Sequence, residues 1–377
     1  MASKRVNQPE SDAVSIGSIN TWSSEIGGEG KEYKKIKTPY SKVIGVRLNP
    51  FTIRQLVMDN EDVCKMAVWE KCTHLFFNCL GFGSTMEFQI GEVSGKSILK
   101  DARTYIPVIR KIKIAHPSIS IIYSMPPLIE SSLKIEDIFA KDPERFWGSL
   151  FNLCDECDGL ELNFEIVEKI PSSFYKSLKT FCDESSMEFY LVLNNSTKFL
   201  ERLPSACRDT LDKSDNLYLV INSFGYLQYE QFGSGRSKTF KLKPNSECGT
   251  SSICASLHSL AEKGYRMGDI VVGMDTCGLC YNLNDEGYAS SMYMVPNKEM
   301  RRINEVFKGK DEISESEGSC LYHFTMGTQK KVISYDSKSV QNWKLEGVQD
   351  CRGVICGDLF FDTQNSLVSK VHESFSQ

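Results

Sequence analysis

The sequence lacks an excess of positive charge and lacks any long apolar run. Its 377 residues include 44 lysines and arginines against 49 aspartates and glutamates, for a formal net charge of −5. The basic residues form no block, so neither nucleic acid nor an anionic membrane surface is an expected partner. No apolar run approaches the roughly 20 residues that a membrane-spanning helix needs, and we therefore expect no membrane span.

The N-terminal region lacks the apolar segment of a secretory signal. Residues 1–22 are MASKRVNQPESDAVSIGSINTW, which predicts a cytoplasmic location. Residues 1–38 are rich in serine, glycine, glutamate and lysine and contain few large apolar side chains, so they are predicted to be a disordered tail. The remaining residues, 39–377, are enough for one large domain with a sizeable core.

The 14 cysteines lack the regular spacing of a metal site. Two CxxC pairs occur, Cys154/Cys157 and Cys277/Cys280, and they lie much farther apart than the roughly 15 to 20 residues of a zinc knuckle. In the fold predicted below, the first pair precedes a strand and the second follows one, which puts them at opposite ends of a barrel. We therefore expect no metal site, and buried free thiols unless the protein is exported and forms disulfides.

After the tail, short β-rich runs alternate with amphipathic segments. Eight runs are predicted to be strands: Val43–Val46, Thr73–Phe77, Ser120–Ser124, Gly159–Asn163, Phe189–Leu193, Leu217–Ile221, Ile270–Met274 and Gly353–Cys356. Predicted helices between them include residues 97–111, 143–154, 172–185, 252–263 and 337–346. This alternation predicts an α/β fold, a parallel sheet closed into a (β/α)8 TIM barrel.

An open doubly wound sheet is the alternative fold. No glycine-rich phosphate loop follows the first strand, which disfavours a nucleotide-binding sheet, and no cofactor is expected. Two polar stretches interrupt the alternation, Glu230–Ser251 and Tyr281–Lys331, and both are predicted to be loops.

The most informative stretch is Asp158–Glu165, DGLELNFE. Because successive strand side chains point to opposite faces, its leucines and phenylalanine share one face while Glu161, Asn163 and Glu165 share the other. Three inward polar side chains are costly to bury unless they are hydrogen-bonded, so a purely structural strand rarely carries them. We predict that all three point into the barrel lumen, with Glu165 at the C-terminal strand end, where barrel enzymes place catalytic residues.

This stretch resembles the active-site strand of the family-18 glycoside hydrolases, the chitinases and chitinase-like lectins, whose pattern is DxxDxDxE. The pattern positions are occupied here by Asp158, Glu161, Asn163 and Glu165. Other segments between about residues 42 and 362 also resemble the family: KCTHLFFNCLGF its second strand, KGYRMGDIVVGMDTCG its seventh, and CRGVICGDLFFD its eighth. Within the family, the chain most resembles the divergent chitinase-like proteins of nematodes. Members are mostly secreted and commonly carry an α+β insertion between strands 7 and 8, which is expected to be reduced or absent here.

The resemblance also implies the chemistry to look for. In the family, the glutamate protonates the glycosidic oxygen while the substrate's own N-acetyl oxygen attacks the anomeric carbon. The aspartate two residues earlier orients the acetamide and balances the positive charge. Glu165 is then the candidate acid, the uncharged Asn163 stands at the orienting position, and Glu161 would restore part of the negative field from farther away. Asp158 is expected to be structural.

Other positions of the family's sugar site are altered. The tyrosine and aspartate that usually end the sixth strand align with Ser223-Phe224, and the tryptophan of the eighth strand aligns with Gly357. Tyr226 and Tyr229 are weaker candidates for sugar stacking.

These features predict a degenerate chitinase-like protein that binds N-acetylglucosamine-type glycans such as chitin, or acts in protein interaction or signalling, with little or no hydrolase activity. One alternative is a slow chitinase or endo-N-acetylglucosaminidase-type hydrolase that uses Glu165 as general acid. Another is a barrel that serves only as a scaffold for a protein partner. Fold analogy does not choose among the three.

Overall fold

The computed structural model describes residues 42–58, 62–82, 87–91, 102–125, 135–163, 170–193, 200, 203–222, 227–232, 239–244, 253–285, 288–307, 309–314, 319–359, 362 and 366–376. The predicted disordered tail, residues 1–38, lies outside these ranges, and the division of the chain after residue 38 stays a prediction.

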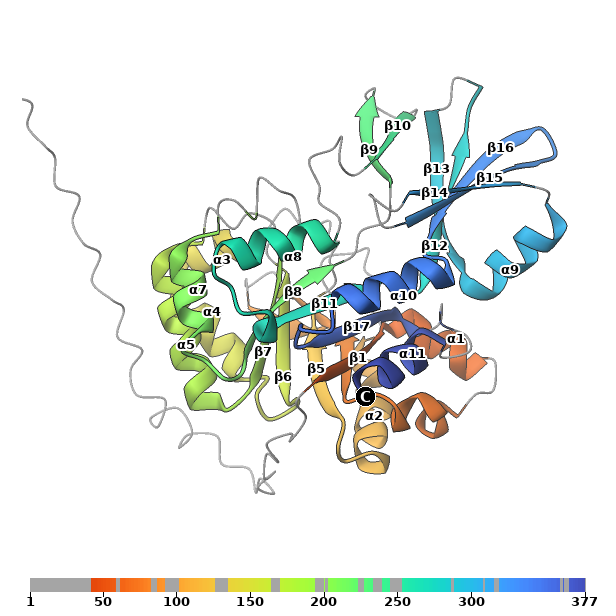
Figure 1. Cartoon of the computed structure of the whole chain (residues 1–377). Coiled ribbons are helices and arrows are strands. Elements are labelled where there is room, and N and C mark those ends of the chain that lie inside the picture. The colour runs from red at the N-terminus through yellow and green to blue at the C-terminus, as the bar shows by residue number, and fades with distance from the viewer. Residues whose placement is uncertain are drawn as a thin grey trace, which may run out of the picture.

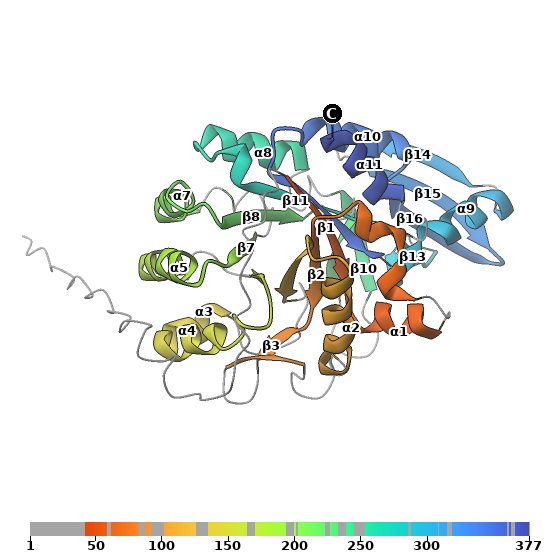
Figure 2. The same cartoon turned by 90° about the horizontal axis from the view of Figure 1, so that it is seen from below.

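Eight parallel strands close into a barrel in the order β1-β17-β11-β8-β7-β6-β5-β2. Helices surround the strands, as Figures 1 and 2 show from two directions. The predicted (β/α)8 barrel is therefore confirmed, and the open doubly wound alternative is wrong. The barrel strands are β1 (Val43–Leu48), β2 (His74–Asn78), β5 (Ser120–Ser124), β6 (Gly159–Asn163), β7 (Glu188–Leu193), β8 (Leu217–Asn222), β11 (Ile270–Met274) and β17 (Gly353–Asp358).

Five of the outer helices correspond to the predicted ones: α2 (Ala102–Ala115), α4 (Pro143–Phe151), α5 (Ser172–Ser185), α8 (Ile253–Glu262) and α10 (Lys338–Gly347). Local chemistry explains where two of them begin. The Asp142 carboxylate accepts a hydrogen bond from the Arg145 backbone N–H at 3.0 Å, and the Ser337 hydroxyl accepts one from Val340 at 3.3 Å. The other elements around the barrel are α1 (Pro50–Met58), α3 (Ile135–Lys141), α7 (Ser205–Leu211), α11 (Ser366–Phe375), the hairpin β3 (Leu80–Phe82) and β4 (Phe88–Ile90), and the 3-10 turns Val63–Lys65, Ala67–Glu70 and Met267–Asp269. None of the described helices is long and apolar enough to cross a membrane.

The alternation along the strands separates two cores. Leu160 and Leu162 of β6 belong to the outer core between the strands and the helices. The inner core fills the middle of the lumen with Val43, Phe76, Ile122, Tyr190, Val192, Tyr218, Val220, Val271 and Ile355. Glu161, between the two leucines, therefore points into the lumen as predicted.

A second sheet stands beside the barrel and corrects two predictions (Figure 1). Between β11 and β17 the chain forms an α+β unit, so an insertion is present and the prediction of a loop over Tyr281–Lys331 was wrong. Part of the other predicted loop, Glu230–Ser251, is strand as well. The unit comprises β12 (Cys277–Leu283), β13 (Tyr288–Pro296), α9 (Asn297–Val306), β14 (Lys310–Ser314), β15 (Ser319–Met326) and β16 (Gln329–Tyr335).

A hairpin that follows β8 completes this second sheet. The hairpin strands are β9 (Leu227–Phe232) and β10 (Thr239–Pro244), and the seven antiparallel strands have the order β14-β15-β16-β12-β13-β10-β9. Helix α9 covers one face through a buried cluster that includes Met300 and Ile303 from the helix and Cys280, Tyr322 and Ile333 from the sheet. This unit was predicted as a loop because the segments between its strands are charged and its strands carry polar residues at their exposed positions.

Candidate functional site

The candidate site is the C-terminal end of the barrel, where parallel strands bring side chains from different parts of the chain together. The alternation places polar residues there on the lumen side of most strands. They are Arg47 on β1, Asn78 on β2, Ser124 on β5, Glu161 and Asn163 on β6, Asn222 on β8, and Asp275 directly after β11.

A buried ion pair crosses the lumen at this end. The Arg47 guanidinium donates two hydrogen bonds to Glu161, from Nη1 to Oε2 and from Nη2 to Oε1, each at 2.6 Å. The Glu161 side chain is fully buried and that of Arg47 is 15% exposed. The Ser124 hydroxyl also donates to Glu161 Oε2 and accepts from Arg47 Nη1 at 3.2 Å. The charge of Glu161 is thus matched by an opposite charge and its oxygens by hydrogen bonds, which is what a buried carboxylate requires.

The electrostatics keep the Arg47 guanidinium charged. Burial tends to lower the pKa of the Arg47 guanidinium, but its ion pair and hydrogen bonds with Glu161 more than offset this, so the pKa is raised overall. The guanidinium also lies over the Phe76 ring, 5.6 Å from its centroid. The negative field expected from Glu161 is therefore largely neutralised by Arg47.

Sequence reasoning missed Arg47. The predicted first strand ended at Val46, two residues too early, whereas β1 continues to Leu48. The sequence did contain an indication of this residue. In a strand, Arg47 lies on the same inward face as Val43 and Gly45, and a charged side chain stands out among these otherwise apolar residues. Nothing local, however, identified Glu161 as its partner.

The other predicted site residues are only partly described. Asn163 is the last residue of β6, pairs in the sheet with Val192, is half-buried, and shares the inward face with Glu161. Glu165 and Tyr226 lie outside the described residues, as do Ser223 and Phe224, so the prediction that Glu165 faces the lumen stays open. Tyr229 lies on β9 and pairs with Leu242 of β10, in the second sheet rather than on a barrel strand.

Asp158 directly precedes β6 and lies at the opposite end of that strand from Asn163. Its carboxylate oxygen Oδ2 accepts hydrogen bonds from the Ile121 backbone N–H at 2.8 Å and from Lys113 Nζ at 2.9 Å. It therefore ties β6 to β5 and α2 at the N-terminal end of the barrel. Of the three pattern positions that the structure describes, Asp158 is the one that lies away from the C-terminal face.

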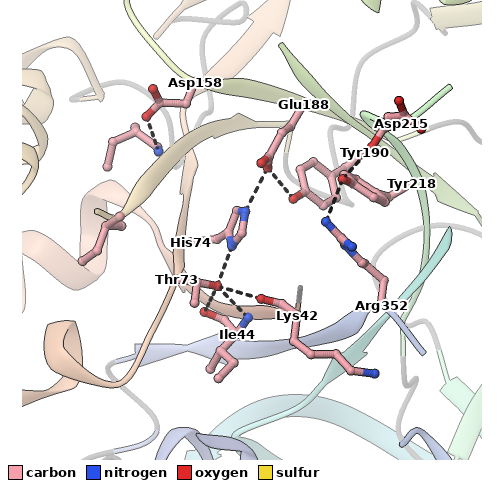
Figure 3. Close-up of polar contacts among 12 residues, drawn as sticks. Lys42, Ile44, Thr73, His74, Asp158, Glu188, Tyr190, Asp215, Tyr218 and Arg352 are labelled. Carbon is pink, nitrogen blue, oxygen red and sulfur yellow. Dashed lines mark hydrogen bonds and ion pairs between the residues drawn. The ribbon is translucent and has the colours of Figure 1, made fainter. Parts of the chain in front are cut away.

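The N-terminal end of the lumen is filled by hydrogen-bonded side chains (Figure 3). His74 Nε2 lies 2.9 Å from Glu188 Oε2 across the lumen, and its Nδ1 lies 2.6 Å from the Thr73 hydroxyl. Tyr190 donates to the same Glu188 oxygen at 2.7 Å. His74 is 2% exposed and bonded on both ring nitrogens, as expected for a core histidine. This network fills the N-terminal end of the lumen with side chains that satisfy one another's hydrogen bonds.

Asp275 adds a carboxyl group of unusual pKa to the C-terminal end. The residue is open to solvent on one side, while protein atoms crowd its carboxyl group. This partial withdrawal from water, with a smaller effect of the Asp336 carboxylate, raises the pKa of Asp275 to about 7, although Lys344 and Arg47 act in the opposite direction. Lys344 is itself held by Asp336 at 2.6 Å.

The raised pKa of Asp275 predicts a pH dependence of stability. The folded state keeps its proton up to a pH of about 7, whereas the unfolded chain releases it near the ordinary value of 3.8. Between these values the folded state binds more protons, so the contribution of Asp275 to stability falls as pH rises. The melting temperature of Asp275→Asn minus that of wild type should therefore increase between about pH 4 and pH 7 and stay constant above pH 7. Thermal melts of both proteins at several pH values test this. The control is Asp155→Asn, because Asp155 is exposed at the N-terminal end of the barrel. If the melting-temperature difference from wild type changed equally with pH for the two variants, the prediction would be contradicted.

Two glycines line the lumen beside Asp275. A Cβ atom added to Gly357 would lie 3.1 Å from both the backbone nitrogen and the hydroxyl oxygen of Thr276, and one added to Gly273 would lie 2.3 Å from Asn222 Oδ1. The positions are thus already filled by neighbours. Strand β17 offers no aromatic floor at Gly357, the position where the family has a tryptophan.

The two CxxC pairs lie at opposite ends of the barrel, as predicted. Cys154 and Cys157 precede β6, whereas Cys277 and Cys280 belong to β12, beyond the C-terminal end of β11. The cysteines that the structure describes are all free thiols. Within those described ranges, no group of three or more histidine, cysteine or acidic side chains could hold a metal ion. That the two pairs bind no common ion stays a prediction.

Solved structures with the same fold are chitinases and chitinase-like proteins. A class V chitinase from Nicotiana tobaccum matches 89% of this chain and 99% of its own, with a TM-score of 0.63 and 14% identity. A family-18 N-acetylglucosaminidase from Paenibacillus barengoltzii matches 88% of this chain and 99% of its own chain, with a TM-score of 0.61 and 13% sequence identity. A chitinase-like agglutinin from Robinia pseudoacacia matches 88% of this chain and 99% of its own chain, with a TM-score of 0.61 and 14% sequence identity.

These similarities establish the fold. No protein-family model matches the sequence, and no curated protein is significantly similar to it. The chain thus has the (β/α)8 barrel of the family-18 chitinases and chitinase-like proteins, as the sequence motifs predicted.

Proposed function

We propose that this chitinase-like barrel binds N-acetylglucosamine-type glycans at its C-terminal end and hydrolyses them slowly or not at all. The observation that carries the proposal is the ion pair between Arg47 and Glu161. Hydrolysis by the mechanism that the resemblance implies needs negative charge beside a developing cation. Here one carboxylate of the motif strand is neutralised by a guanidinium, and the next inward position is the uncharged Asn163.

Glycan binding is supported by the character of the same end of the barrel. Amides, a hydroxyl and a carboxyl converge there from different strands, and such groups fix the orientation of a ligand in a concave site. Structural neighbours include enzymes as well as an agglutinin, so the fold serves proteins of both kinds. A protein partner and a cytoplasmic location stay predictions.

The test is a calorimetric titration of the purified full-length protein with an N-acetylglucosamine tetramer, with products measured by chromatography on the same sample. We expect saturable binding without release of shorter oligomers, and weaker binding of a cellulose tetramer. Efficient turnover that Glu165→Gln abolishes would identify a hydrolase that uses Glu165 as general acid instead. Absence of binding to any oligomer would favour the scaffold for a protein partner.

A further inference from the structure

Asn78 is a buried polar side chain whose oxygen has no partner. It is the last residue of β2, follows Phe76 on the lumen face, and is 8% exposed. Among the described residues, nothing donates a hydrogen bond to its Oδ1 atom. A buried carbonyl without a donor is destabilising, so an acceptor in this position favours a ligand or water that supplies one.

Arg47 offers unused donors next to this acceptor. Its hydrogen bonds to Glu161 and Ser124 use three of the five N–H groups of a guanidinium. Within the described part of the chain, the other two have no partner. Arg47 and Asn78 flank the same residue, because Asn78 pairs with Ser124 in the sheet while Arg47 donates to the Ser124 hydroxyl.

The ion pair explains why Arg47 does not simply turn to Asn78. The guanidinium is anchored by two hydrogen bonds to a fully buried carboxylate, and releasing it would leave that charge unpaired. The lumen therefore presents a fixed donor on β1 and an acceptor on the neighbouring strand β2. The acetamide of an N-acetylated sugar carries the complementary groups on its two opposite edges, a carbonyl oxygen to accept and an N–H to donate, and it fits between the two side chains.

Resting on the proposed glycan-binding function, we infer that Asn78 and Arg47 are the residues that select N-acetylated sugars. The acetamido N–H donates to Asn78 Oδ1, and its carbonyl oxygen accepts from the free N–H groups of Arg47. Selection for the acetamide thus lies on β1 and β2, across the lumen from Asn163, the position that the motif pattern indicated.

The experiment compares the affinity of each protein for the N-acetylglucosamine tetramer and for the glucosamine and cellulose tetramers of equal length. We expect wild type to prefer the N-acetylated tetramer. Asn78→Leu, close in shape, should weaken that binding by about 10-fold while leaving the cellulose tetramer unaffected, so that the preference disappears. Asn163→Leu should retain the preference. Asn152→Leu, exposed at the N-terminal end of the barrel, is the control and should behave as wild type.

Stability provides a readout that does not depend on any ligand. Because Asn78→Leu removes a buried acceptor without a partner, the variant should melt at or above the wild-type temperature. Asn78→Ala provides a second test should the leucine variant not fold. A preference that survives in both Asn78 variants, or that only Asn163→Leu abolishes, would overturn the inference. Absence of glycan binding by wild type would instead overturn the proposed function. If the protein bound an N-acetylated peptide amide in an Asn78-dependent manner but bound no glycan, the site would be a peptide site and the inference would be wrong.

Discussion

Replacing Arg47 by methionine should lower the free energy of unfolding by about 3–5 kcal/mol, the usual effect of removing one partner of a buried ion pair. Methionine keeps much of the packing volume against Phe76 but leaves the fully buried Glu161 without its countercharge. Among the described residues, only the Ser124 hydroxyl would still donate to that carboxylate. Urea denaturation measures the loss as a lower midpoint at an unchanged slope.

Two further variants separate this effect from a general effect of losing an arginine. Arg110→Met removes a surface partner of Glu156, with the two side chains 60% and 35% exposed, and should change stability by no more than about 1 kcal/mol. The double variant Arg47→Met/Glu161→Leu removes both charges and should recover most of the loss. If Arg47→Met lowered the free energy of unfolding no more than Arg110→Met does, water would have to reach Glu161, and Arg47 would not neutralise its charge.

Turnover of an N-acetylglucosamine oligomer should be at background for wild type and should stay low after Asn163→Asp. A preorganised charge beside a developing cation is typically responsible for a factor on the order of 10² or more in rate. Restoring the aspartate supplies one such charge. Glu161 remains neutralised by Arg47, and Gly357 provides no aromatic floor for the reacting sugar. We therefore expect the gain from Asn163→Asp to fall well short of that factor.

The assay follows oligomer cleavage by chromatography over long incubations, with Glu165→Gln as the control for contaminating activity. Equal background for wild type and Glu165→Gln is the expected result. Efficient wild-type cleavage that disappears in Glu165→Gln would show that other residues compensate for these substitutions. The protein would then be a working hydrolase, and the glycan-binding proposal would give way to it.

The sequence alone determined the barrel. Each of the eight strands was predictable because a barrel strand is buried on both faces and therefore appears as a short run rich in β-branched and aromatic residues, and helical segments separate these runs. The alternation of side chains along a strand placed Glu161 in the lumen between Leu160 and Leu162. Strand and helix positions of this kind are properties of local sequence, so no knowledge of distant contacts was needed.

The second sheet was decided by tertiary structure. Strands β9 and β10 join a sheet whose other members follow β11, so their pairing partners lie far away in the chain. Taken locally, Glu230–Ser251 and Tyr281–Lys331 are polar and resemble loops. Antiparallel pairing and the cover provided by α9 stabilise them as strands, and neither is encoded in a short window.

The candidate site shows the same division. The sequence indicated which side chains of β6 point inward, but it did not indicate that Arg47 of β1 neutralises Glu161 or that Asn78 is buried without a donor. These properties arise where strands distant in sequence meet across a closed lumen, and the same closure raises the pKa of Asp275 to about 7. Residue type and alternation give the direction of a side chain, whereas its charge state and its partner depend on what the folded barrel places opposite it.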